Sequence, residues 1–254
     1  MRRSRRTETG EFLVDGAQAV AEAVAYEAET PGCVQELYLT EAAAGRNTGL
    51  VRRAFAARIE VTQVTDRAAA ALSETQSPQG LVARCRMHDV SLEVGLAGSP
   101  TLVAVLVQTN DPGNAGTIIR LADAAGADAV IVAGDAVDPF NPKVVRASTG
   151  SLFHLPIIRL PDPAELLAQL AAAGLSTLAT AGTAELDLDT AVRDGLLDLP
   201  TAWLFGSEAH GLPVEIVAAA DAAVRVPIHG RAESLNLASA AALCLYASAG
   251  AHRR

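Results

Sequence analysis

The sequence has few cysteines and no long apolar run, and both shortages exclude classes of protein. Cys33, Cys85 and Cys244 lie far apart, without a CxxC pair or a cysteine and histidine spacing that suggests a zinc site, so we expect reduced thiols and no zinc site. No uninterrupted apolar run approaches the roughly 18 residues that a membrane span needs. The basic start leads into polar TETGEF rather than an apolar segment, so we expect no secretory signal. These features predict a cytoplasmic protein without a metal or a membrane partner.

Positive charge is also scarce. The chain has 20 lysines and arginines against 29 acidic residues, a net charge of -9 and a pI near 5.0. This balance argues against a general polyanion binder, because non-specific affinity for nucleic acid comes mostly from neutralised phosphates. Any such role must use local patches, and the start MRRSRR is one candidate. A solvated, disordered tip is the alternative interpretation of that segment.

Half of the 254 residues are apolar, so the chain can bury a substantial core as one large or two small domains. Alternating β-rich and Ala-rich runs predict a small α/β domain over residues 1–88, and loss of periodicity predicts a linker over 89–99. A second α/β series follows over 100–254. Its apolar strands, separated by helices, predict a mostly parallel sheet covered on both faces. We expect these strands at 101–108, 128–133, 154–160, 175–180, 201–206 and 222–227.

The stretch 102–135 has the outline of a dinucleotide-binding unit, with a strand, a glycine-containing turn, a helix and a second strand. Gly113 and Gly116 fit the second and third glycines of a G-x-G-x-x-G fingerprint, but the first position falls on Asp111. A carboxylate there repels a phosphate at the helix N-terminus. Asp135 is placed to bind a ribose, so a nicotinamide-dependent oxidoreductase with an atypical loop stays open as an alternative.

The same turn carries more polar groups than a phosphate cradle requires. Asn114 could act as a helix cap and Arg120 as a surface ion-pair partner, so the turn by itself does not decide between structure and function. Two later stretches also end strands in polar turns, LFGSEAHGLP at 204–213 and VPIHGRAESLNLASAAALCLYA at 226–247.

Together with NDPGNAGTIIRLADAAGA at 110–127, these stretches resemble, in order, the three motifs of the SpoU (TrmH-type) RNA 2'-O-ribose methyltransferases of the SPOUT superfamily. FLVDGAQAVAEAV and SETQSPQGLVA in the first domain resemble the ends of the L30e-like RNA-binding domain that often precedes the catalytic one. The resemblance implies an α/β fold with a deep trefoil knot, a rare exception to unknotted connections. It also implies S-adenosylmethionine bound in loops of the knot.

The resemblance also implies the site residues. The cofactor contacts carried over from the motifs and their neighbouring loop are Thr180, Ala181, Gly206, Ile228 and Leu235. The catalytic residues carried over are Arg120, Asn114, Glu208, Ser234 and Asn236. Each has a structural alternative: Ile228 and Leu235 suit core positions, Glu208 suits a helix N-terminus, and Ser234 and Asn236 suit caps.

The implied function is methyl transfer to a ribose 2'-hydroxyl, most readily in 23S rRNA because of the first domain, with tRNA as the alternative. The family's members act as homodimers. A non-catalytic RNA binder would lack the five catalytic residues, which are all present. Residues before about 95 carry 11 basic and 13 acidic groups, against 9 and 16 in the remainder. The less negative charge of the first domain favours it, with Arg52, Arg53 and Arg58, as the part that binds RNA.

Overall fold

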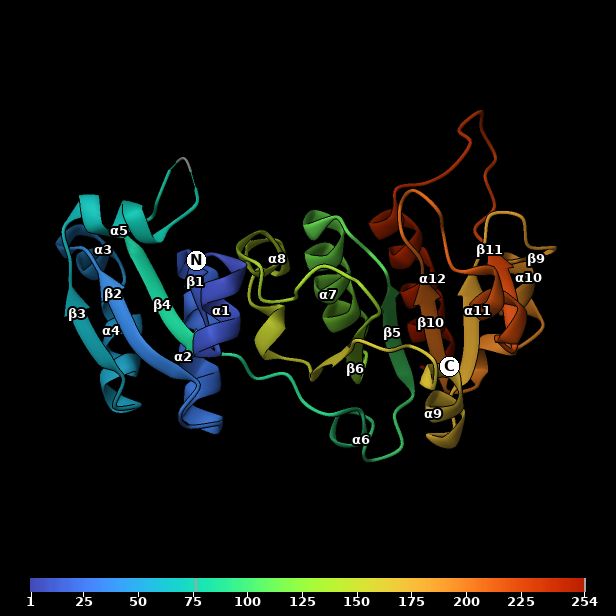
Figure 1. The fold of residues 1–254 in the computed structure, drawn as a ribbon, viewed down its shortest axis with the longest axis horizontal. Coiled ribbons are helices and arrows are strands. Elements are labelled where there is room, and N and C mark those ends of the chain that lie inside the picture. The colour runs from blue at the N-terminus through green and yellow to red at the C-terminus, as the bar shows by residue number, and fades with distance from the viewer. Residues whose placement is uncertain (76, 254) are drawn as a thin grey trace. The chain divides into compact units, whose positions relative to one another are not determined.

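The computed structural model describes residues 1–75 and 77–253, so Gln76, within the stretch SETQSPQGLVA, lies outside the described residues. The chain forms two compact units, which we describe one at a time (Figure 1). The first comprises Met1–His88 together with Phe140–His154, and the second comprises Asp89–Pro139 and Leu155–Arg254.

In the described part of the first unit, four strands form a sheet in the order β1-β4-β2-β3. β4 pairs antiparallel with β1 and β2, while β2 and β3 are parallel. One face packs against α2 through fully buried Phe12, Val14 and Leu37, as expected for strands whose inward residues alternate with outward ones. The elements of this unit are α1 (Arg3–Thr9), β1 (Glu11–Asp15), α2 (Ala17–Glu29), β2 (Val34–Leu39), α3 (Glu41–Arg46), α4 (Thr48–Ala56), β3 (Glu60–Gln63), α5 (Asp66–Leu72), β4 (Leu81–Arg86), α8 (Pro142–Ser148) and the 3-10 helix η1 (Ser151–Phe153).

The arginine-rich start is helical, so the interpretation of a disordered tip is wrong for Arg3–Thr9. Helix α1 ends at Gly10 in the left-handed conformation, which glycine adopts without strain. Arg6 is buried and donates to the carbonyl of Met1 at 2.7 Å. Arg5 pairs with Glu8 on the helix surface. Two of the four arginines are therefore engaged within the helix and its start.

The segment Phe140–His154 belongs to the first unit, although the sequence predicted it within the domain at 100–254. Phe140 and Phe153 pack with Phe12 and His88 in an aromatic cluster with centroid distances of 4.8 to 6.2 Å. His88 also donates from Nε2 to the carbonyl of Leu152 at 3.0 Å. Burial of these rings explains why the segment belongs to the first unit rather than to the second, because aromatic side chains contribute large apolar areas wherever they pack.

In the described part of the second unit, seven strands form a wholly parallel sheet in the order β7-β6-β5-β10-β8-β11-β9. The α/β class and the parallel sheet are confirmed, and the two-residue strand β9 is an addition to the predicted strands. The elements are α6 (Leu92–Gly95), β5 (Leu102–Val107), α7 (Pro112–Ala125), β6 (Ala129–Ala133), β7 (Ile157–Leu160), α9 (Leu166–Ala172), β8 (Ser176–Thr180), β9 (Leu186–Asp187), α10 (Leu188–Arg193), the 3-10 helix η2 (Leu196–Asp198), β10 (Thr201–Phe205), α11 (Val214–Ala219), β11 (Ala222–Arg225) and α12 (Leu237–Ala251).

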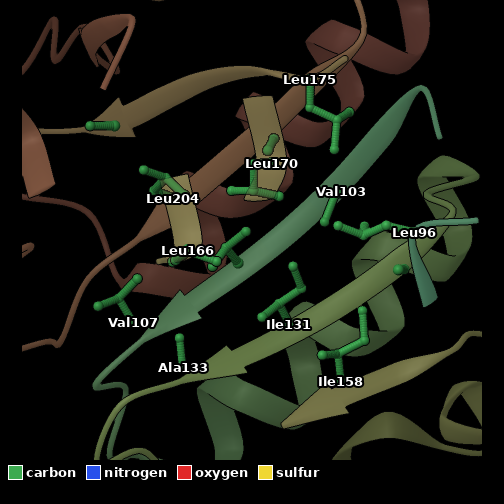
Figure 2. Close-up of a cluster of buried hydrophobic side chains, with 14 of the residues drawn as sticks. Leu96, Val103, Val107, Ile131, Ala133, Ile158, Leu166, Leu170, Leu175 and Leu204 are labelled. Atoms are coloured by element: carbon green, nitrogen blue, oxygen red, sulfur yellow. The ribbon is translucent and has the colours of Figure 1, made fainter. Parts of the chain in front are cut away.

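Both faces of this sheet are covered. Alternate residues of β5 and β6, such as Val103 and Ile131, pack with Leu166 and Leu170 of α9 and with Leu96 (Figure 2). The opposite face packs against α7 and α12, where the indole of Trp203 donates to the hydroxyl of Ser248 at 2.9 Å. Double coverage accounts for strands that are apolar throughout.

The predicted linker at 89–99 is part of the second unit. Ser91 caps the short helix α6, and Val90 forms a parallel bridge with Ile158 of β7. A side chain at Gly95 would meet Ile158 Cδ1 at 2.5 Å, so this segment lies against the sheet rather than apart from it. No helix in the described ranges is long and apolar enough to cross a membrane.

Candidate cofactor and RNA site

A cavity of about 590 Å³ lies where strands β8, β10 and β11 end. Parallel strands bring their carboxyl ends to one edge of a sheet, and ligands of open α/β sheets bind there. The volume is within the range of small-molecule sites. The cavity is lined by Thr180, Ala181, Gly182, Gly206, Ser207, Glu208, Gly211, Val224, Arg225, Val226, Ile228, Glu233, Ser234, Leu235, Asn236, Leu237 and Ala240.

All five expected cofactor contacts line this cavity. Thr180 also donates from its hydroxyl to the carbonyl of Leu204 at 2.8 Å, which ties the end of β8 to β10. Ile228 and Leu235 are each 38% exposed, so the alternative that they are ordinary core residues is wrong. With Val224, Val226 and Leu237 they give the cavity apolar side chains, which suit an aromatic ring.

The turn after β10 requires glycine at its first residue. Ser207 and Gly211 exchange two backbone hydrogen bonds of 3.0 and 2.9 Å, and this closes the turn back on the strand. A Cβ at Gly206 would lie 2.1 Å from the carbonyl carbon of Gly211 and 2.2 Å from the nitrogen of Leu212. Only a residue without a side chain fits there, so Gly206 allows the turn that forms this wall of the cavity to close.

One residue from each motif joins a chain of hydrogen bonds beside the cavity. Asn236 donates from Nδ2 to Oδ1 of Asn114 at 3.0 Å, and Asn114 donates from Nδ2 to Oε1 of Glu208 at 2.9 Å. The backbone nitrogen of Asn110 lies 3.5 Å from the second oxygen of Glu208. Since Glu208 and Asn236 are exposed and Asn114 is half-buried, this polar chain is accessible to a substrate.

Helix caps fix two members of the polar chain, Asn114 and Asn236. Asp111, not Asn114, is the N-cap of α7 and accepts from the Asn114 amide at 2.7 Å. The Asn114 side chain is therefore free to reach Glu208. Asn236 caps α12 by accepting from the backbone amides of Ala238 and Ser239. It is therefore both a helix cap and a member of the polar chain. The Asp111 carboxylate occupies the position that a dinucleotide phosphate would need.

The remaining two catalytic candidates, Arg120 and Ser234, are not members of the polar chain. Ser234 lines the cavity. Arg120 is exposed on α7, six residues after Asn114, and does not line the cavity. Neither side chain makes a hydrogen bond or ion pair within the described residues. A long, exposed guanidinium can reach a substrate that the structure does not contain.

Sequence reasoning missed several lining residues, of which Arg225 and Glu233 are charged. Arg225 directly precedes the third motif and Glu233 lies within it, so their position in the sequence was the available signal. In the described part of the chain, no three His, Cys, Asp or Glu side chains gather to hold a metal ion.

A parallel sheet with a ligand cavity and a polar chain at its carboxyl edge defines an α/β protein with a ligand site of the kind that open parallel sheets carry. The SpoU rRNA Methylase family model matches residues 101–246, and an MRM3-like substrate binding domain matches residues 1–83. The chain belongs to the SpoU rRNA methylase family, which confirms the resemblance.

Similar proteins match nearly the whole chain. The 23S rRNA (guanosine(2553)-2'-O)-methyltransferase RlmP of Bacillus subtilis is 33% identical over 95% of this chain and 89% of its own. The 23S rRNA (uridine(2479)-2'-O)-methyltransferase of Streptomyces viridochromogenes is 34% identical over 96% and 84%. The AdoMet complex of the SpoU methyltransferase AviRb from the same organism has a TM-score of 0.81 and 32% identity, over 98% and 93%.

Replacing Gly206 by alanine should abolish binding of S-adenosylmethionine, because the new Cβ cannot coexist with the backbone of Gly211. Isothermal titration calorimetry measures this, and circular dichroism checks that the protein still folds. Gly45→Ala is the matched control, since a Cβ there meets no atom within 4 Å. Binding by Gly206→Ala with wild-type affinity would contradict the assigned wall of the cavity.

Proposed function

We propose that this protein transfers the methyl group of S-adenosylmethionine to a ribose 2'-hydroxyl of ribosomal RNA, acting in the cytoplasm. The observation that carries the proposal is the polar chain of Asn114, Glu208 and Asn236, which joins the three family motifs beside a cavity of suitable size. The relatives support it, since those named above are 23S rRNA 2'-O-methyltransferases and one was solved with AdoMet.

The cavity fits the cofactor. Gly206 allows the turn that forms one wall of the cavity to close, and Ile228 and Leu235 offer apolar surface to the adenine. Ala181 and Thr180 form the neighbouring wall. When bound, the cofactor supplies an electrophilic methyl group on a sulfonium. The trefoil knot implied by the resemblance is part of this proposal, with the loops after β8, β10 and β11 as its binding loops.

The protein's own contribution to the reaction is positioning and charge stabilisation, because a ribose hydroxyl is a very weak acid. The polar chain holds Glu208 and Asn236 in fixed geometry next to the cavity, and Ser234 adds a hydroxyl at the same wall. A guanidinium offers hydrogen-bond donors and no acceptor, which makes Arg120 a poor general base. Its role is to orient the target phosphate and ribose and to stabilise the alkoxide as the proton leaves.

Large-subunit rRNA is the preferred substrate, with tRNA as the alternative. Both curated relatives described above act on 23S rRNA, and the N-terminal residues match a substrate-binding domain. Within that domain, Arg52, Arg53 and Arg58 are exposed and have no hydrogen-bond or ion-pair partner among the described residues. Surface arginines without a protein partner are suited to contacts with phosphates, so these three are proposed to bind the RNA backbone.

The protein is also proposed to act as a homodimer through its second domain. The long helix α12 supports this, because Leu243 and Tyr246 are 47% and 52% exposed one turn apart on its surface. Large apolar side chains gathered on one helix face are typical of a contact with a partner.

Arg120→Ala should lower methyl transfer from labelled S-adenosylmethionine to 23S rRNA by roughly 100-fold or more, the usual effect of removing a charge-stabilising donor. Affinity for the cofactor, measured by calorimetry, should stay unchanged, and NAD should not bind to either protein. Arg193→Ala, an exposed arginine of α10, is the control. Wild-type activity in Arg120→Ala would refute its catalytic role, and wild-type protein that binds NAD but not S-adenosylmethionine would refute the proposed function.

Reversing charge at Arg52 and Arg53 should weaken RNA binding and reduce the slope of log K against log salt by about two, because each phosphate contact releases counterions. Filter binding with a 23S rRNA transcript at several salt concentrations measures both. Cofactor affinity should not change. Equal losses in RNA and cofactor affinity would indicate damage to the fold, and an unchanged salt slope would place the RNA elsewhere.

Light scattering after gel filtration should give a mass near twice 26.1 kDa. Leu243→Glu together with Tyr246→Glu should shift the protein toward the monomer, because two carboxylates cannot be buried unpaired in an interface. A wild-type protein that elutes as a clean monomer at assay concentration would rule out the proposed dimer.

A further inference from the structure

The loop between β8 and β9 forms one wall of the proposed cofactor cavity. Ala181 and Gly182 line it, and the chain then turns back to the sheet. The turn is closed by Ala184, whose amide donates to the carbonyl of Ala181 at 3.1 Å, while the Ala181 amide donates to Val224 at 3.1 Å. Strand β9 consists of only two residues at the edge of the sheet and pairs only with β11 in the described structure. The backbone alone therefore fastens this loop weakly.

One side chain fastens it at two further points. Arg225, the last residue of β11, donates from Nε to the carbonyl of Ala184 at 2.9 Å. Its terminal nitrogen lies 3.4 Å from Oδ2 of Asp187. The planar guanidinium is suited to this, since its donors point in fixed directions. Arg225 thus spans from the middle of the loop to the strand that ends it.

Asp187 is held in turn by the next helix. Its other oxygen, Oδ1, accepts from the Thr190 amide at 2.8 Å and so caps α10. These hydrogen bonds from Thr190, and the charge of Arg225, lower the pKa of the Asp187 carboxyl. The carboxylate is therefore ionised at neutral pH and available to Arg225, although the pair is partly exposed and its direct contribution to stability is small.

Arg225 also differs from every other residue at the cavity. It is the only cation among the described residues that line it, whereas Glu208 and Glu233 are acidic. A guanidinium that acts only through its charge does not require a hydrogen bond to a loop carbonyl such as that of Ala184. The contacts with Ala184, inside the loop, and with Asp187, in the strand that ends it, indicate that Arg225 fixes the conformation of the loop.

We propose that Arg225 is a positioning residue that holds the loop 181–187 in the conformation that binds S-adenosylmethionine. The inference rests on the proposed function, because it takes the cavity as the cofactor site. If the loop without Arg225 populated that conformation about a tenth of the time, the apparent cofactor affinity would fall about tenfold. The chemistry at the polar chain would be unaffected once the cofactor is bound.

The test compares Arg225→Ala, Arg225→Gln, Arg225→Lys and the control Arg193→Ala. Arg193 is an exposed arginine of α10 that pairs with Asp194, donates to the Thr190 hydroxyl at 2.9 Å and does not line the cavity. Its charge also lowers the pKa of the Asp187 carboxyl, so this variant controls for a change of charge near Asp187 without loss of a contact to the loop. Hydrogen exchange of peptides covering 181–187 reports on the loop without any ligand. Calorimetry with S-adenosylmethionine and steady-state kinetics with 23S rRNA report on function, and the fluorescence of the single tryptophan, buried Trp203, reports on folding.

Arg225→Ala should exchange faster at 181–187 and should raise the cofactor Kd and KM about tenfold, with kcat and the KM for RNA within about twofold of wild type. Arg225→Lys, which keeps the charge but not the two-pronged donor, should recover only part of the affinity. Arg193→Ala should match wild type. If Arg225→Ala does not fold, the same comparisons apply to Arg225→Gln and Arg225→Lys.

Unchanged exchange at 181–187, or unchanged cofactor affinity, would overturn the inference while leaving the proposed function intact. Full recovery by lysine would overturn it in favour of a purely charge-based role. A drop in kcat at saturating cofactor without a change in Kd would assign Arg225 to the reaction itself. Failure of the wild-type protein to bind S-adenosylmethionine would instead remove the proposed function, and the inference with it.

Discussion

The hydrogen-bonded chain from Asn236 through Asn114 to Glu208 is the constraint on which the site depends. Its two hydrogen bonds join residues that are 122 and 94 positions apart in the sequence, and it forms only if three segments reach the same edge of the sheet. Each member has a direction: a carboxylate can only accept, so Asn114 must donate to it and must present its oxygen to Asn236. Loss of any one member would leave polar groups of the others without their partner.

The strand order makes this convergence possible. β5, which precedes the first motif, lies next to β10, which precedes the second, and β8 and β11 continue the same parallel array. All four strands therefore end at one edge. The helix caps complete the arrangement, because Asp111 satisfies the start of α7 and releases Asn114, while Asn236 uses one atom for the start of α12 and another for Asn114.

The site has two sides with different physical requirements. The polar chain needs side chains of defined hydrogen-bonding character. The cavity wall instead needs backbone segments that lie close to each other, as Gly206 does to Gly211 and Leu212. The cavity wall at 181–187 lies at the sheet edge, where only two residues of β9 pair with β11. Side-chain contacts such as those of Arg225 matter most there, because edge backbone has fewer fixed partners than the central strands.

Much was determined by the sequence alone: the α/β class, the parallel sheet and the family, because apolar strands between helices and ordered motifs are local patterns. The five cofactor candidates came from the motifs and from the loop after β8, and all line one cavity. Only tertiary structure decided that Phe140–His154 packs with the first unit, that Asp111 rather than Asn114 caps α7, and that Arg225 fastens the loop at 181–187. Those features depend on contacts between segments distant in the chain. A local pattern does not specify which distant group will pack on a ring or accept a hydrogen bond from an amide or a guanidinium.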